Sequence, residues 1–96
     1  MKNLNKFMVE SFGEKGVQEK YIEQVENGLW IGEDYMFKKY LKKKGGSVLD
    51  LGCGTGRTTI PLQKMGLKVI GIDITPEMIT NAQKIAKKKN LKIDYR

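Results

Sequence analysis

The stretch of residues 47–74, SVLDLGCGTGRTTIPLQKMGLKVIGIDI, decides the fold of this 96-residue chain. It opens with the apolar run 48–51, which is too short for a helix and is typical of a buried strand. A turn rich in glycine follows, then an amphipathic segment over residues 57–65, then a second apolar run that stops at Asp73. Strand, glycine turn, helix, strand and acid in this order predict a βαβ unit that holds a nucleotide-like ligand.

The turn contains three alternating glycines, Gly52, Gly54 and Gly56. Glycine allows positive φ and keeps side chains out of the space where a ligand approaches the backbone. The turn leads into a helix N-terminus, whose unpaired N–H groups favour negatively charged groups. Asp73, at the carboxyl end of the second strand, is placed to accept hydrogen bonds from a ribose hydroxyl pair.

The spacing of the glycines narrows the class of nucleotide. The dinucleotide fingerprint needs glycine at the first, third and sixth positions of the turn, and the sixth position here is Arg57. The turn is not a Walker loop either, because no Gly-Lys-Ser/Thr follows it. The pattern therefore disfavours both a nicotinamide dinucleotide and a nucleoside triphosphate.

The segment VLDLGCGTG, with an aspartate closing the next strand in VIGIDITPEMI, closely resembles the class I S-adenosylmethionine-dependent methyltransferases. The resemblance implies that the glycine loop packs against the methionine part of the cofactor, that Asp50 helps to hold its amino group, and that Asp73 binds its ribose hydroxyls. It places Ile74 beside the adenine. The implied cofactor-binding residues are Asp50, Gly52, Cys53, Gly54, Gly56, Asp73, Ile74 and Met78.

The resemblance also implies an α/β fold with a Rossmann-like sheet, of which this chain supplies three parallel strands in the order 3-2-1. The chain stops before the loops after strands 3 and 4, where the family keeps adenine contacts and catalytic residues, so the catalytic residues stay unknown. We expect an N-terminal fragment of a methyltransferase. Residues 47–96 would form the first half of the cofactor-binding domain and residues 1–46 an N-terminal helical lid segment.

The remaining elements follow from periodicity and capping signals. A helix is expected over about residues 32–44 and another from Pro76 to about residue 89, with Thr75 as its N-cap. A third strand is expected over residues 91–95. Aromatic side chains of the N-terminal segment are candidates either for a lid or for the core, with both open for Tyr21 and Trp30. Other lid candidates are Phe7, Phe12 and Tyr35, whereas the core is favoured for Phe37 and Tyr40.

Composition limits the other classes of function. The net charge of +7 comes almost wholly from lysines, and only two arginines are present, so we expect solvated helix ends rather than a nucleic-acid surface. Cys53 is the single cysteine, which excludes an intramolecular disulfide and favours a small loop residue over a reactive thiol. There is no histidine and no cluster with metal-ligand spacing, so we expect no metal. No apolar run approaches the ~20 residues of a membrane helix, and we predict a cytoplasmic protein.

Two alternatives remain beside the methyltransferase: a non-catalytic cofactor-binding or interaction module, and a less favoured NAD-type dinucleotide-binding domain. The first strand is central in the family's sheet, so in this chain it would have an unpaired edge, and one face of the sheet would be bare. We therefore expect a homo-oligomer that pairs through the strand 1 edge or the bare sheet face.

Overall fold

A three-stranded parallel sheet forms the centre of the computed structural model, which describes residues 2–41 and 45–96. Strand β1 (Ser47–Leu51) pairs with β2 (Lys68–Ile72), and β2 pairs with β3 (Asp94–Tyr95). The register sets Leu49 opposite Ile70 and Gly71 opposite Tyr95. The predicted α/β class and the strand order 3-2-1 are confirmed.

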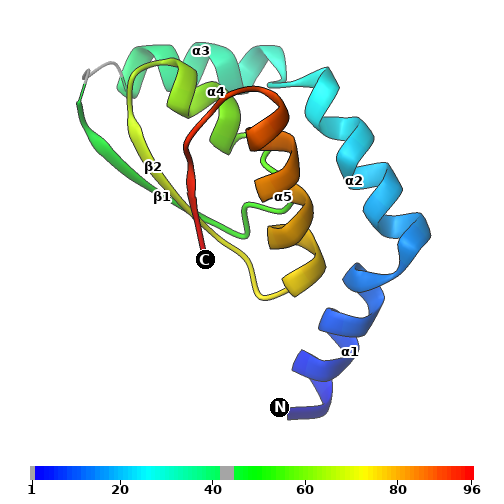
Figure 1. Cartoon of the computed structure of the whole chain (residues 1–96). Coiled ribbons are helices and arrows are strands. Elements are labelled where there is room, and N and C mark those ends of the chain that lie inside the picture. Colours follow the sequence, from blue (N-terminus) through cyan, green and yellow to red (C-terminus); the bar gives the residue numbers. More distant parts are fainter. Residues whose placement is uncertain (1, 42–44) are drawn as a thin grey trace.

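The helices lie around this sheet as Figure 1 shows. They are α1 (Lys2–Gly13), α2 (Lys15–Asn27), α3 (Ile31–Tyr40), α4 (Thr59–Lys64) and α5 (Pro76–Lys88). Helices α1 and α2 run along the side of α5, while α3 and α4 lie beside β1 and β2. The polypeptide therefore wraps its N-terminal helices around the βαβ unit.

Helices α3, α4 and α5 cover one face of the sheet. From α4, Leu62 packs with Leu67 and Val69 in a buried cluster, and Phe37 of α3 lies against it. From α5, Ala82 packs in a second cluster. The other buried members of that cluster are Cys53, Ala86 and Tyr95. Both clusters contact the side of the sheet from which Val69 projects, because side chains two apart on a strand share a face.

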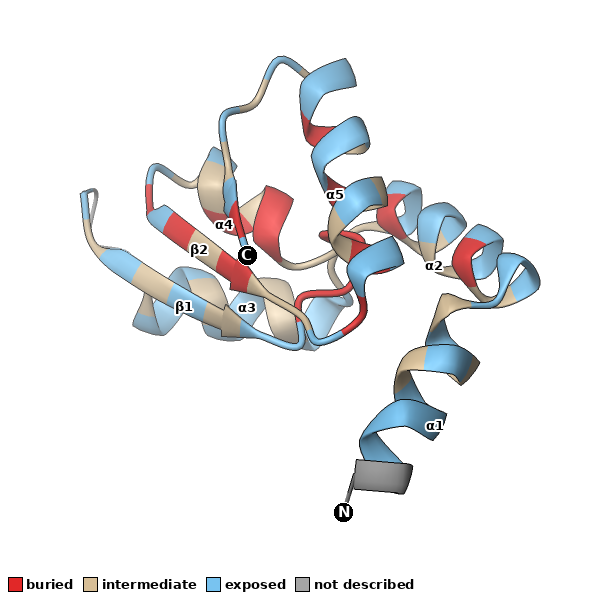
Figure 2. Cartoon of the chain, turned by 60° about the horizontal axis from the view of Figure 1, so that its bottom comes forward, coloured by how far each residue is buried: buried red, intermediate tan, exposed pale blue. Residues whose placement is uncertain are grey.

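The opposite face of the sheet is uncovered within the described residues. On β1, Leu49 is 55% exposed and Leu51 is 71% exposed, while Ile70 and Ile72 of β2 are half-buried. Figure 2 shows the contrast between β1, which has no buried residue, and the buried positions of β2. The outer edge of β1 pairs with no strand in the described part of the chain. Of the two alternating sets of β1 side chains, the leucines are thus the exposed one.

The structure corrects several sequence-based boundaries. The helix predicted over 57–65 starts only at Thr59. The hydroxyls of Thr58 and Thr59 instead donate hydrogen bonds to the Asp50 carboxylate of β1 at the end of the turn. The strand predicted over 91–95 is restricted to β3, because Leu91 and Ile93 pack against the α5 cluster instead of pairing. The helix predicted over 32–44 ends at Tyr40, and residues 42–44 lie outside the described residues.

The prediction that Tyr40 belongs to the core is wrong, since this residue is 65% exposed. Helix α3 contacts the sheet cluster through Phe37 and the following Leu41, four residues apart on one face. Tyr40 is turned outwards, where the Lys39 ammonium lies 5.3 Å from the centre of its ring. The core assignment of Phe37 is confirmed, because it packs against the buried cluster.

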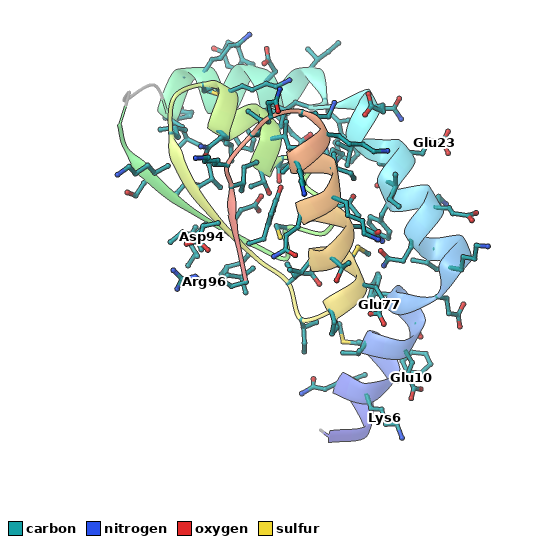
Figure 3. All side chains as sticks on the ribbon, in the orientation of Figure 1. Lys6, Glu10, Glu23, Glu77, Asp94 and Arg96 are labelled. Atoms are coloured by element: carbon teal, nitrogen blue, oxygen red, sulfur yellow. The ribbon has the colours of Figure 1, made fainter. Side chains whose placement is uncertain are left out.

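Helices α1 and α2 dock on α5 through small and polar residues. Gly13 ends α1, and a Cβ there would lie 2.9 Å from the Glu77 carboxylate. Figure 3 labels Glu77 where α5 begins beside α1. Further along, Asn81 Nδ2 donates a hydrogen bond of 2.8 Å to Oε1 of the buried Gln18. These contacts hold the N-terminal helices beside the carboxyl end of β2.

Candidate functional site

The glycine loop after β1 is fixed to the end of β2. The backbone N–H groups of Gly52 and Cys53 donate to the Ile72 carbonyl at 2.8 and 3.0 Å. Gly52 and Gly54 have φ of +69° and +55°, in the left-handed region that favours glycine. A Cβ at Gly52 would meet nothing within 4 Å, and one at Gly54 would meet its nearest atom at 3.8 Å. The loop backbone therefore faces open space.

Gly56 has a different role from the other two loop glycines. A Cβ at Gly56 would collide with the hydroxyl of Tyr95 from β3. Gly56 is not among the residues that line the two cavities described below. Its lack of a side chain is required by packing under the loop.

Asp73 follows β2, and its carboxylate is held by two backbone groups. The N–H of Gly54 donates to Oδ2 at 2.9 Å, and the N–H of Thr75 donates to Oδ1 at 2.9 Å. Each carboxylate oxygen has a second acceptor position. The acid is therefore fixed beside the glycine loop and can accept further hydrogen bonds there. Thr75 is the N-cap by position, as predicted, but its side chain makes no capping bond.

Asp50, in β1, lies behind the loop. Its Oδ2 accepts hydrogen bonds from the hydroxyls of Thr58 at 2.7 Å and Thr59 at 2.8 Å. Asp50 does not line either cavity, although Thr58 does. The carboxylate thus ties the end of the glycine turn to β1.

Two cavities adjoin across the glycine loop. The first, of about 410 Å³, is mostly apolar. It is lined by Met8, Phe12, Tyr21, Gly52, Gly54, Ile72, Asp73, Ile74, Thr75 and Met78. The second, of about 400 Å³, is lined by Tyr21, Gln24, Trp30, Gly52, Cys53, Gly54, Thr55, Arg57 and Thr58. Both share Gly52, Gly54 and Tyr21, so one extended ligand can occupy both.

The candidate lid residues lie differently around these cavities. Tyr21 stands between the cavities, and Thr55 Oγ1 donates a hydrogen bond of 2.7 Å to the Tyr21 carbonyl. Trp30 lines the second cavity with much of its ring exposed. Phe12 lines the first cavity, and its ring meets that of Tyr21 edge-on at 6.2 Å. Phe7 and Tyr35 line neither cavity.

Sequence reasoning missed an ion pair that borders the second cavity. Arg57 Nη1 and Nη2 donate to Glu33 Oε1 and Oε2 at 2.6 and 3.0 Å. Nη1 also donates to the Gly28 carbonyl at 3.2 Å, and the guanidinium lies 4.9 Å from the Trp30 ring centre. The hydrogen bond from Arg57 lowers the pKa of Glu33. No sequence pattern joins residues so far apart, and in the sequence Arg57 stands out only because it occupies the sixth position of the turn, where the dinucleotide fingerprint has glycine.

Cys53 lies in the loop with a buried side chain. Burial, followed by the nearby charges of Asp50 and Asp73, raises the pKa of its thiol to about 12. The thiol is therefore neutral at physiological pH and a poor nucleophile. Among the described residues, no three Cys, Asp, Glu or His side chains are grouped so that they could hold a metal ion.

The comparisons with known proteins agree on one family. Residues 42–96, more than half of the chain, match the model of a family described as a methyltransferase domain. The ubiquinone biosynthesis O-methyltransferase of Actinobacillus pleuropneumoniae is 40% identical over 76 residues, which make up 79% of this chain and 26% of that protein. The chain thus spans about a quarter of the length of this curated relative.

Solved structures show the same relationship. An S-adenosylmethionine-dependent methyltransferase from Methanosarcina mazei is similar with a TM-score of 0.59 and 29% identity, over 72% of this chain and 33% of its own. The magnesium protoporphyrin IX methyltransferase of Synechocystis PCC 6803 has a TM-score of 0.68 over 96% of this chain and 52% of its own; at 21% identity it speaks for the fold alone. The chain belongs to the methyltransferase-domain family, whose members use S-adenosylmethionine.

Proposed function

We propose that this chain binds S-adenosylmethionine across the two cavities and supplies the cofactor-binding part of a methyltransferase. The observation that carries the proposal is the open backbone of Gly52 and Gly54 between the cavities, with the Asp73 carboxylate fixed beside it. Residues 47–96 are assigned to cofactor binding and residues 1–46 to a covering segment.

The shape and chemistry of the cavities support one orientation of the cofactor. In the first cavity, Asp73 accepts hydrogen bonds from the ribose hydroxyls, and Ile74 and Met78 offer apolar contacts to the adenine. The methionine part crosses the loop at Gly52 and Gly54 and enters the second cavity. The cofactor supplies a methyl group that is already activated on a sulfonium, so the protein chiefly has to hold and align it.

Calorimetric titration tests this proposal directly. The chain should bind S-adenosylmethionine and S-adenosylhomocysteine in preference to a nicotinamide dinucleotide. Asp73→Ala should weaken binding by about 1–3 kcal/mol, because the ribose hydroxyls lose a charged acceptor. Asp94→Ala is the matched control, since Asp94 pairs with Arg96 on the outer strand, as labelled in Figure 3, and lines neither cofactor cavity. Equal binding by the wild type and Asp73→Ala, or tighter binding of the dinucleotide, would refute the proposal.

We propose further that the basic surface is not a specific nucleic-acid site. In helices α3, α4 and α5, lysines lie in the last turns, where they complement the helix dipole: Lys38 and Lys39, Lys64, and Lys87 and Lys88. Binding to RNA or DNA should be weak and should disappear by physiological salt, as bound counterions are no longer released favourably. Retention of one RNA at that salt would contradict this assignment.

We also propose that the protein works in the cytoplasm as a homo-oligomer. Within the described residues, no helix has the length and apolar character needed to cross a bilayer. The unpaired edge of β1 and the exposed Leu49 and Leu51 support pairing between copies. Light scattering coupled to size exclusion tests the homo-oligomer, and fractionation of cells tests the cytoplasmic location.

A further inference from the structure

The ion pair between Arg57 and Glu33 is the most enclosed one among the described residues. The two side chains are 23% and 24% exposed, whereas in every other such ion pair at least one partner is much more exposed. The guanidinium also lies over Trp30 and bonds the Gly28 carbonyl. We use the name clasp for Arg57, Glu33, Trp30 and the Gly28 carbonyl.

The clasp joins the N-terminal segment to the glycine loop. Gly28 caps the C-terminal end of α2, where unpaired carbonyls and the helix dipole favour a cation. Two residues earlier than Arg57, Thr55 bonds the Tyr21 carbonyl in the middle of α2. The side chains of Thr55 and Arg57, which both line the second cavity, therefore hold α2 at two carbonyls that are seven residues apart.

The clasp borders only one of the two cavities. Arg57 and Trp30 line the second cavity and not the first, which holds Asp73 and the apolar wall of Ile74 and Met78. A ligand confined to the first cavity makes no contact with the clasp. A ligand with a chain that crosses the glycine loop reaches Trp30.

We propose that Arg57 is a positioning residue whose clasp closes the second cavity around the amino-acid end of the cofactor, and so sets the preference for ligands that carry this end. The inference rests on the proposed cofactor and extends it to the second cavity, which is lined by α2, by Trp30 just before α3 and by the glycine loop. Arginine suits the task because its planar fork bonds both carboxylate oxygens and stacks on the indole at once. Lysine would keep the charge and lose both features.

Two ligands that share the nucleoside separate this role from a merely structural one. S-adenosylhomocysteine carries the amino-acid end, and 5′-methylthioadenosine lacks it. In Arg57→Lys and Glu33→Gln, affinity for S-adenosylhomocysteine should fall about tenfold, as expected for loss of a charged hydrogen bond. Affinity for 5′-methylthioadenosine should stay within about twofold. Asp34→Asn is the matched control, because it removes a neighbouring charge whose partner is Lys38 on the same helix.

Trp30 adds a spectroscopic readout, because it is the only tryptophan of the chain. Its emission should change on addition of S-adenosylhomocysteine and not on addition of 5′-methylthioadenosine. Equal loss of both ligands in the clasp variants would mean that Arg57 only supports the fold, and unchanged binding of both would mean that the clasp has no part in binding. Either result overturns the inference while leaving the proposed cofactor intact. A wild type that binds neither ligand would instead overturn the proposed function, and the inference with it.

Discussion

The ring of Tyr95 in β3 lies directly on the backbone of Gly71 in β2. A Cβ at Gly71 would be 2.7 Å from Tyr95 Cδ1 and 3.0 Å from Cys53 Sγ. From there the ring extends beneath the glycine loop, where its hydroxyl meets the backbone of Gly56. Strand β3 therefore supports the glycine loop through the Tyr95 ring, which fits there because Gly71 and Gly56 have no side chains.

Gly71→Ala should destabilise the chain by about 1–3 kcal/mol, because the new methyl group overpacks a rigid contact of ring, sulfur and backbone. Gly71 has an ordinary φ, so the effect is steric. Gly16→Ala, in α2, makes the same chemical change where nothing lies within 4 Å and should stabilise slightly. Urea unfolding of the two variants and the wild type measures both signs. A Gly71→Ala variant as stable as the wild type would show that the ring can move away.

Tyr95→Phe should leave stability unchanged or raise it by about 1 kcal/mol. The Tyr95 hydroxyl is buried and, although it lies near the Thr59 side chain, no described residue meets it with hydrogen-bond geometry, so its removal breaks no well-formed hydrogen bond and relieves a desolvated group. Burial is also the main reason that its pKa is raised to about 12. Thermal unfolding compares the two proteins. A loss of stability greater than about 1 kcal/mol would reveal a bound partner for the hydroxyl.

The βαβ unit could be predicted from the sequence because the patterns that indicate it are local. Glycine spacing, apolar runs and the strand-end Asp73 each act within a few residues, and they predicted the βαβ unit and the position of its loop, whereas the strand order 3-2-1 was implied by the resemblance to the methyltransferase family. The resemblance implied that Gly56 contacts the cofactor, whereas in the structure Gly56 makes room for Tyr95, and a glycine that admits a ligand looks the same in sequence as one that admits a ring. Only the packing of β3 separates them.

The contacts of the N-terminal segment could not be predicted in the same way. Glu33 and Arg57 meet because α2 and α3 fold back over the loop, and nothing in the spacing of either residue indicates this. The outward turn of Tyr40 has a similar origin, because helical periodicity gives an apolar stripe but not its rotation against the sheet. Both the Glu33–Arg57 contact and the orientation of Tyr40 depend on how segments far apart in the sequence pack against one another.

Gly54→Val should abolish cofactor binding. The branched side chain would project into the space shared by the two cavities and would resist the positive φ. Gly45→Val is the matched control: Gly45 has a φ of +80° and no atom within 4 Å of a Cβ, but it lines neither cofactor cavity. Gly45→Val carries the same backbone strain as Gly54→Val, but it should still bind S-adenosylmethionine in calorimetry. Binding by Gly54→Val at wild-type strength would mean that the ligand does not cross the loop.

The clasp should make stability depend on pH in the acidic range. Arg57 lowers the pKa of Glu33 from its ordinary value of 4.5, so the stabilisation is complete above that value and is lost as the pH falls through the lowered pKa. Unfolding experiments at a series of pH values should show the wild type converging on Glu33→Gln under acid. Asp34→Asn serves again as the control and should keep the wild-type slope in this range. A constant difference between wild type and Glu33→Gln at every pH would contradict the role of the charge.

The bare face of the sheet should drive copies of the chain to associate. The exposed side chains of Leu49 and Leu51 lie next to the edge of β1 that pairs with no strand in the described part of the chain. Full burial of one leucine is worth about 1.5–3 kcal/mol. That is a large fraction of the 5–15 kcal/mol that typically stabilises a domain. Light scattering coupled to size exclusion at micromolar concentration should therefore detect a dimer or larger species.

Leu51→Lys tests where the copies meet, because it places a charge on the bare face without touching the buried clusters behind the sheet. This variant should shift the protein towards the monomer, since a buried unpaired ammonium is costly. Tyr40→Lys, which changes an exposed ring on α3 to the same side chain, should leave the assembly as it is. A wild type that elutes as a monomer and unfolds cooperatively would show that the exposed leucines are tolerated in water. If Leu51→Lys still assembles, the contact between copies does not lie on this face. The surface of α3, where Ile31 and Tyr35 are also exposed, would then be the next candidate.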